Sequence, residues 1–425
     1  MKKLVLLIVM LLFALPAVAQ ENVSPLLDLL ALVPDNSTSR GDIISYQDLR
    51  AVENAIDLPR PESGVAFLAS RPSLMFTQRW LGMPPQVSYA RNLMEEMPAT
   101  VGFDFFDINR TLTFAAPPET TVIWSGDFDL DAIAEAHEAR GFQASEINGV
   151  PALCGADGCD SGTAVSPSNI ERGNLFDPAL GRQVPFLTLP ETLVSSPRLE
   201  LLEAVADASQ GNDSSLLDAR DYRTLAEAIT DPAAYSGELV SALLLPTDLV
   251  LEALDFTDAA SLMPLLGQFA TPEQLETLVN NPPDFIADYG TLPVYRLAAI
   301  ADRQEGEWQV AVVALVYNSA EDAEIAAPEL AQRLETFSGF LRTQDDEPFL
   351  SRFPSSTVES RVYTSDETGF SAAVVEVRYP MPSQEEQATP DQSSEGAPRF
   401  PAAYYRYLVD SIYQRGLYPL WLVEQ

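Results

Sequence analysis

The stretch that decides the fold class is residues 120–147, TTVIWSGDFDLDAIAEAHEARGFQASEI. Apolar and polar side chains alternate over residues 120–124, which predicts a strand. Residues 130–140 predict a helix, and Gly141 is typical of the position that ends one. Residues 142–147 then resume the pattern of a strand. A strand, a helix and a strand in one short stretch favour an α+β fold.

A similar order of elements recurs nearer the C-terminus. The sequence predicts a long strand rich in Val and Ala, then a helix kinked or restarted at Pro328, and then two more strands: residues 308–317, 319–337, 358–364 and 370–379. The recurrence favours two copies of one unit, although few residues are identical between them. We therefore expect an α+β protein of two related strand-helix-strand lobes with antiparallel sheets, plus a C-terminal helix.

The composition changes along the chain predict five parts. Residues near 390 are rich in Pro, Glu, Ser and Gln with almost no apolar side chains, so burial cannot offset the entropy of ordering them. Aromatic and aliphatic residues at helical spacing follow, and we expect them to pack on the body of the protein. The parts are a signal peptide (1–19), an N-terminal α+β lobe (20–240), a second α+β lobe (241–380), a disordered linker (381–399) and a docked C-terminal helix with its tail (400–425).

The first residues have the pattern of a secretory signal peptide. Lys2 and Lys3 precede an apolar run over residues 4–15, and small residues end it at Ala19. The run is too short to span a bilayer and remain there, and no later apolar stretch reaches about 18 residues. A buried N-terminal helix is the alternative. We expect cleavage after Ala19, no membrane span and a secreted or periplasmic location.

The chain is strongly acidic, with 62 Asp and Glu against 25 Lys and Arg and a formal net charge of −37 at pH 7. Removing the two signal-peptide lysines changes this charge to about −39 and leaves no lysine. Such a surface disfavours nucleic acid and anionic lipid as partners. It favours cationic partners or ions. The acidity fits either a saline or calcium-rich habitat or a GC-rich genome that replaces lysine by arginine.

Cys154 and Cys159 are the only cysteines of the chain. The intervening Asp157-Gly158 pair is a strong turn signal, which brings the two thiols together at the end of a hairpin. A disulfide is expected, because such bonds persist in an exported protein. Closing so short a loop contributes roughly 2 kcal/mol. A zinc site is the alternative, but it requires two further ligands in a chain with one histidine.

Few routes to catalysis are open to this composition. The absence of lysine after residue 3 excludes Schiff-base and phosphate-loop chemistry in the mature chain. The single histidine, His137, is expected on an exposed helix face, and no Gly-x-Ser-x-Gly elbow accompanies it. A carboxylate pair remains possible. Asp104 and Asp107 are the candidates because phenylalanines flank them, although a turn with the phenylalanines packed inside is the favoured interpretation.

Calcium is the one cofactor that the sequence suggests. Asp127, Asp129, Asp131 and Glu138 match the acidic positions 1, 3, 5 and 12 of a calcium loop. Position 6 is Ala132 rather than the required glycine. Capping of the following helix and stabilisation of its dipole are the simpler interpretation of these acids.

Two short segments carry a weak resemblance to known proteins. Residues 193–197 (LVSSP) and 214–222 (SSLLDARDY) resemble segments of secreted bacterial proteins of unknown function. The resemblance covers about 40 residues around these segments. It implies an exported α+β protein and brings no catalytic residues with it.

These observations favour an exported, soluble protein with a non-enzymatic binding or structural role at the cell exterior. Its partner would be an extracellular ligand or protein rather than nucleic acid. A secreted hydrolase that uses a carboxylate pair is the alternative, and it requires two carboxylates that converge in a deep cleft. A shallow apolar groove would favour ligand binding. A large exposed apolar patch would favour assembly with other proteins.

Overall fold

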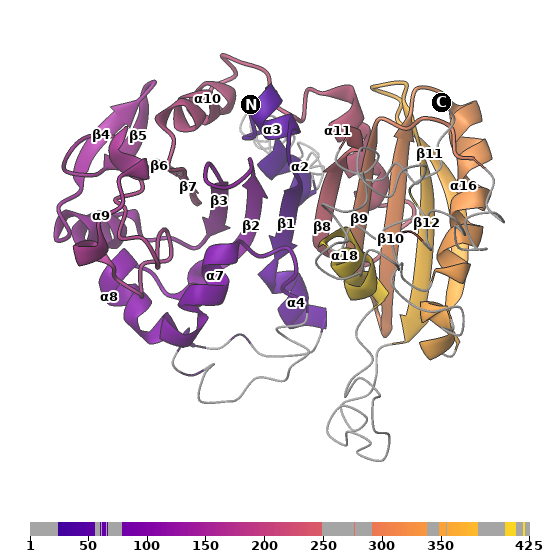
Figure 1. The fold of residues 1–425 in the computed structure, drawn as a ribbon, viewed down its shortest axis with the longest axis horizontal. Coiled ribbons are helices and arrows are strands. Elements are labelled where there is room, and N and C mark those ends of the chain that lie inside the picture. The colour runs from indigo at the N-terminus through magenta and orange to yellow at the C-terminus, as the bar shows by residue number, and fades with distance from the viewer. Residues whose placement is uncertain are drawn as a thin grey trace, which may run out of the picture.

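The fold is built on one continuous antiparallel sheet, seen in a computed structural model (Figure 1). The structure describes residues 24–55, 79–248, 291–337, 348–353, 355–380 and 404–413, together with the isolated residues 60, 62–64, 66, 276 and 420. Within these residues, 12 strands follow the order β11-β12-β10-β9-β8-β1-β2-β3-β7-β6-β5-β4. The predicted antiparallel α+β class is confirmed. The predicted signal peptide (1–19) and linker (381–399) lie outside the described residues.

The first part of the chain supplies seven strands of the sheet. Its elements are α2 (Pro25–Leu30), α3 (Ser37–Arg40), β1 (Ile44–Asp48), α4 (Leu49–Ala55), α7 (Pro85–Ala90), η1 (Arg91–Glu96), α8 (Met97–Val101), η2 (Phe105–Asp107), β2 (Ile108–Phe114), β3 (Thr121–Gly126), α9 (Leu130–Glu138), β4 (Gln143–Ile147), β5 (Val150–Cys154), η3 (Ser161–Thr163), η4 (Pro167–Asn169), β6 (Phe186–Leu189), β7 (Thr192–Ser195) and α10 (Leu199–Ser209).

The second part supplies the other five strands. Its elements are α11 (Arg220–Thr230), β8 (Glu238–Pro246), β9 (Leu297–Glu305), β10 (Trp308–Tyr317), α16 (Ala320–Thr336), η5 (Phe349–Arg352), β11 (Thr357–Thr364), β12 (Ser371–Pro380) and α18 (Tyr404–Tyr413). The predicted lobe boundary at residue 240 falls inside β8.

The two parts of the sheet follow the same order of elements. In each, a helix precedes the first strand, a long connection leads to a hairpin, a helix follows, and the last strand returns to pair with the third. The first strands, β1 and β8, pair with each other antiparallel, for example at Tyr46 and Ala242. This pairing joins the two sheets expected from the sequence into one. Four strands, β4 to β7, follow α9 in the first part. Only two strands, β11 and β12, follow α16 in the second part.

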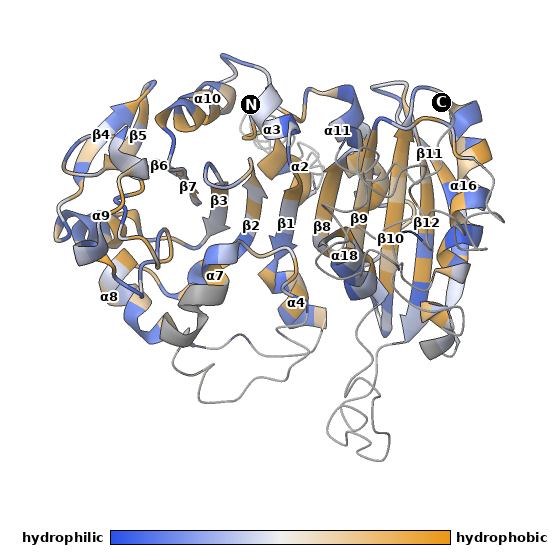
Figure 2. Cartoon of the chain, in the orientation of Figure 1, coloured by the Kyte–Doolittle hydropathy of each residue, from blue (hydrophilic) through white to orange (hydrophobic). Residues whose placement is uncertain are grey.

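Helices cover both faces of the sheet, which explains why β10 is buried along almost its whole length. Its residues alternate between two cores, with Val312 in the core under α2, α10 and α11 and Val313 in the core under α16 and α18. Strands buried on both faces are apolar at nearly every position, as the orange strands of Figure 2 show. A third core packs α8 and α9 against the first part of the sheet, around Trp124.

The deciding stretch folds as the sequence predicts. It forms β3, α9 and β4, and the later unit forms β10, α16, β11 and β12. Ser319 caps α16 by accepting a hydrogen bond from Asp322 N at 3.1 Å, and Pro328 lies inside that helix. In the part of the chain that the structure describes, none of the helices combines the length and apolar character needed to cross a bilayer.

Candidate functional site

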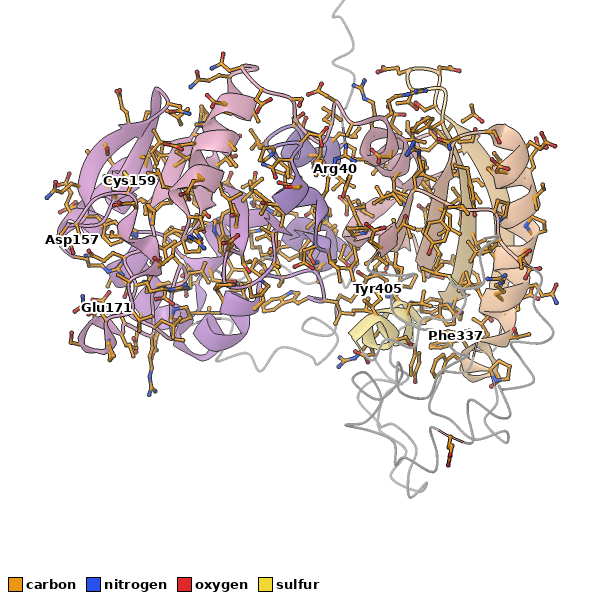
Figure 3. All side chains as sticks on the ribbon, turned by 45° about the horizontal axis from the view of Figure 1, so that its top comes forward. Arg40, Asp157, Cys159, Glu171, Phe337 and Tyr405 are labelled. Carbon is orange, nitrogen blue, oxygen red and sulfur yellow. A yellow bond between two sulfur atoms is a disulfide. The ribbon has the colours of Figure 1, made fainter. Side chains whose placement is uncertain are left out.

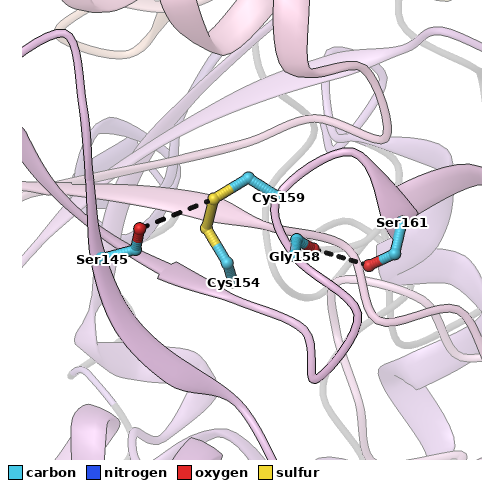
Figure 4. Close-up of a disulfide and its surroundings, with 5 residues drawn as sticks. All are labelled: Ser145, Cys154, Gly158, Cys159 and Ser161. Carbon is cyan, nitrogen blue, oxygen red and sulfur yellow. Dashed lines mark hydrogen bonds between the residues drawn. A yellow bond between two sulfur atoms is a disulfide. The ribbon is translucent and has the colours of Figure 1, made fainter.

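The predicted disulfide between Cys154 and Cys159 is confirmed (Figure 4). Cys154 is the last residue of β5, and the chain turns back at once, with Gly158 N donating to Gly155 O at 3.0 Å. The two Cα atoms are 4.7 Å apart. The turn is held further by the Ser161 hydroxyl, which donates to Gly158 O at 2.7 Å. The disulfide therefore fixes the start of the long loop that follows.

Two of the four acids proposed to bind calcium have hydrogen-bond or ion-pair partners within the protein. Asp129 is the N-cap of α9, and its Oδ1 accepts hydrogen bonds from Asp131 N at 3.1 Å and Ala132 N at 3.2 Å. Asp127 pairs with Arg50 at 3.1 Å. Across the described ranges, no three His, Cys, Asp or Glu side chains gather so that they could hold a metal ion. Calcium binding at Asp127, Asp129, Asp131 and Glu138 stays a prediction.

Asp104 and Asp107 form a reciprocal cap around η2. Asp104 Oδ1 accepts from Phe106 N at 3.0 Å, and Asp107 Oδ2 accepts from Asp104 N at 2.7 Å. Asp104 also accepts from Gly64 N, at 3.1 Å. Burial raises the pKa of Asp107 above its ordinary value. Both carboxylates therefore bind backbone N–H groups, as the turn interpretation requires.

His137 lies in the interior rather than on the exposed face that the sequence suggested. Its ring is fully buried, with ring centroids of Phe142 and Phe186 at 5.0 and 4.7 Å. Nδ1 is 2.9 Å from Ile133 O, so this nitrogen carries the proton and donates it. Burial lowers the pKa of His137 to about 4. The spacing of four residues from the buried Ile133 was the available signal, because the two side chains share one helix face.

The loop of residues 155–185, which joins β5 to β6, exposes apolar side chains that sequence reasoning missed. Val165 is 59% exposed, and Ile170 and Leu180 are each 42% exposed. They are three of the seven large apolar residues that are exposed in the described part of the chain. Isolated exposed apolar residues are ordinary in folded proteins, whereas these three belong to a single loop.

The backbone brings these three side chains into one neighbourhood. Ser166 N, next to Val165, donates to Leu180 O at 3.1 Å. Gly181 has a φ of +67°, and a Cβ there would lie 2.0 Å from Ser166 O and 2.9 Å from Ile170 N. Only glycine permits so close an approach. We call the exposed side chains of Val165, Ile170 and Leu180 the apolar loop surface.

Buried groups on the inner side hold this loop against the sheet. Phe176 is buried, and its ring stacks on Phe186 of β6 at 4.8 Å between centroids. The buried Asp177 carboxylate accepts hydrogen bonds from Leu180 N at 3.3 Å and Arg182 N at 2.5 Å. The apolar loop surface therefore projects from a fixed backbone rather than from a chain without anchors.

The loop lies at one end of the molecule. Figure 3 labels Asp157, Cys159 and Glu171 of the loop at the end opposite Phe337 and Tyr405. Glu171 pairs with Arg140 at 2.5 Å, which ties the outer part of the loop to the end of α9. The arrangement therefore places exposed apolar side chains beside charged groups at this end of the molecule.

Comparison with known proteins places this chain in no family. No protein-family model matches the sequence, and no curated protein matches it. Among solved structures, crystal form III of TP0453, a bacterial protein, is similar with a TM-score of 0.29 and 8% identity, over 83% of this chain and 93% of that chain. Crystal form I gives a TM-score of 0.29 and 10% identity, over 77% and 93%. Only weak structural neighbours therefore accompany this fold.

Proposed function

We propose that this chain is an exported protein with a non-enzymatic binding role at the cell exterior, and that the apolar loop surface contacts a partner protein. The observation that carries the proposal is the joint exposure of Val165, Ile170 and Leu180 on an anchored loop. Each buried Å² of apolar surface contributes about 25 cal/mol, so a partner that covers these side chains is favoured. Because the backbone is already ordered, binding costs little conformational entropy.

Export is supported by the bond between Cys154 and Cys159. Disulfides form and persist in oxidising compartments such as the bacterial periplasm. The signal-peptide pattern of residues 1–19 and the excess of acidic residues agree with this location.

The alternative, a hydrolase based on a carboxylate pair, receives less support from the geometry. The carboxylates of Asp104 and Asp107 accept hydrogen bonds from backbone N–H groups of the cap around η2. His137 is fully buried among phenylalanines, and its Nδ1 already donates to Ile133 O. General acid–base catalysis requires groups within hydrogen-bond reach of a substrate.

We also infer that the two parts of the sheet are copies of one unit. The supporting observation is the shared order, in which β1, β2, β3 and β7 correspond to β8, β9, β10 and β12. α2 and α11 precede the first strands and contribute to the same core, and α9 and α16 follow the hairpins. An experimental structure in which these elements do not superpose would contradict the inference.

The binding role is tested by site-specific photocrosslinking in the producing cell. A photoreactive residue at position 165 or 170 should give one discrete protein adduct. The matched controls carry the same residue at position 294 or 325, where Val294 and Ile325 are also exposed apolar residues. An adduct at the loop positions alone, abolished by Leu180→Ser, is the expected result. Equal labelling at all four positions, or none, contradicts the proposal.

A further inference from the structure

The exposed Arg220 and Arg296 stack on the partly buried Phe370, far from the apolar loop surface. Arg220 is the first residue of α11, Arg296 directly precedes β9, and Phe370 directly precedes β12. The guanidinium carbons of Arg220 and Arg296 lie 4.0 and 5.3 Å from the centroid of the Phe370 ring. We call these three residues the arginine–phenylalanine stack. α11 and β12 lie in the half of the molecule opposite β4 and β5 (Figure 1).

The two arginines differ from the others in their charge environment. Among the arginines whose side chains the structure describes, only Arg172, Arg220 and Arg296 lack a carboxylate oxygen within 4.0 Å. Two of these three share one aromatic ring. In a chain with 62 acidic residues, two neighbouring exposed cations without a carboxylate form a local positive site.

Each guanidinium keeps hydrogen-bond donors available. Arg220 donates to Thr368 O from Nε, at 2.8 Å, and from Nη2. Arg296 donates from Nε to Asn318 Oδ1 at 2.7 Å. Nη1 of Arg220 and both Nη atoms of Arg296 have no acceptor among the described residues. A guanidinium has five N–H donors in a planar fork that fits a carboxylate or phosphate.

The stack is held in place before any ligand arrives. The turn that carries Phe370 is closed by Ser365 N donating to Phe370 O at 3.0 Å and by Gly369 N donating to Ser365 O at 2.9 Å. The buried hydroxyls of Thr368 and Thr224 lie 2.5 Å apart and join this turn to α11. Stacking on a ring fixes the plane of a guanidinium and leaves its edge open for an oxyanion.

Two of the carboxylates near the stack in sequence are engaged with other arginines. Asp221 pairs with Arg40 at 3.1 Å, and Glu367 pairs with Arg223. These acids therefore do not neutralise Arg220 or Arg296.

We propose that Arg220 and Arg296 bind the oxyanion group of a small molecule, a carboxylate or a phosphate. Phe370 supports both guanidinium planes, and the unused Nη groups supply the hydrogen bonds. Such charge-assisted, paired contacts are stronger and more specific than contacts to a single ammonium group. The site is separate from the proposed protein contact and does not depend on it.

The proposal is tested by calorimetric titration of the purified protein with citrate and with inorganic phosphate at matched ionic strength. Saturable 1:1 binding is expected, and Arg296→Gln should weaken it about tenfold or more because a charged hydrogen-bond donor is lost. Arg220→Gln should act similarly. Arg172→Gln, which removes another exposed arginine without a carboxylate, should leave the affinity unchanged.

The outcomes separate the ligand classes and the proposal itself. Binding of citrate alone assigns a carboxylate ligand, binding of phosphate alone assigns a phosphate ligand, and either supports the site. If Arg220→Gln loses its fold, Arg296→Gln alone decides, because Arg296 is exposed and bonds only the exposed Asn318 through its side chain. Absence of saturable binding, or equal weakening in Arg172→Gln, would overturn the proposal.

Discussion

Arg79 and Asp302 form a two-pronged ion pair in the interior of the protein. Nε of Arg79 donates to Oδ2 of Asp302 at 2.8 Å, and Nη2 donates to Oδ1 at 2.9 Å. The side chains are 3% and 0% exposed. Gln304 and Gln309 complete the network, accepting from Arg79 at 2.6 Å and donating to Asp302 at 2.9 Å. The pair links the segment before α7 to β9.

Replacement of Asp302 by Ala should destabilise the fold by about 3–5 kcal/mol, because removal of one partner leaves a buried, uncompensated charge. Chemical denaturation followed by circular dichroism measures this change. The matched control is Asp410→Ala, which breaks an exposed pair with Arg406. That control should cost less than about 1 kcal/mol. Equal losses of stability in the two variants would show that the buried Arg79–Asp302 pair contributes no more than the exposed pair.

His137 should make the stability of the fold depend on pH between about 6.5 and 4. Its pKa is about 4 in the folded chain against an ordinary 6.5, so the unfolded chain binds more protons in this window. Stability is therefore unaffected by His137 above the upper value and falls as pH falls, by roughly 3 kcal/mol in total. The free energy of unfolding of His137→Phe should lack this pH dependence. The difference between the two unfolding curves over pH isolates it from carboxylate titration, and parallel curves would refute it.

Removal of the disulfide should destabilise the protein modestly. Cys154 and Cys159 enclose a loop with a sequence separation of 5, so the chain-entropy effect is about 2 kcal/mol. The double variant Cys154→Ser, Cys159→Ser should show this loss in denaturant unfolding. Reductant should lower the stability of the parent chain to the same level and leave the variant unchanged. A reductant effect of equal size on the variant would rule out this explanation.

Gly181→Ala should disturb the apolar loop surface more than a comparable substitution elsewhere. Gly181 and Gly211 have nearly the same φ, +67° and +70°, so both substitutions carry the backbone cost of about 1 kcal/mol. Only at Gly181 would the new Cβ meet backbone, at 2.0 Å from Ser166 O, whereas nothing lies within 4 Å at Gly211. Hydrogen exchange at Ser166 should therefore accelerate in Gly181→Ala alone. Equal exchange in both variants would contradict the close approach.

Local patterns predicted local structure well. Residues 308–317 were predicted as a strand and form β10, because a strand buried on both faces is apolar at nearly every position. Ser319 was predicted as the start of the next helix and caps α16. These features depend on neighbours in the sequence, so they can be predicted from it.

Features that depend on distant residues were not predicted. The pairing of β1 with β8 joins residues about 200 positions apart, and the spacing of apolar residues in the sequence does not indicate this pairing. His137 was misplaced because its charged neighbours in sequence outweighed its spacing from Ile133. Arg220 and Arg296 gave no signal, since their common partner Phe370 comes from a third segment.

The antiparallel pairing of β1 with β8 has an evolutionary consequence. Under the proposed duplication β1 and β8 are equivalent strands, and equivalent strands that pair antiparallel are related as two molecules are around a two-fold axis. An ancestor made of one unit would have an open edge at its first strand and would close it as a homodimer. A fragment of residues 211–425 should therefore self-associate in gel filtration through β8. Fusion of the two genes would then have turned an intermolecular contact into the centre of a single chain.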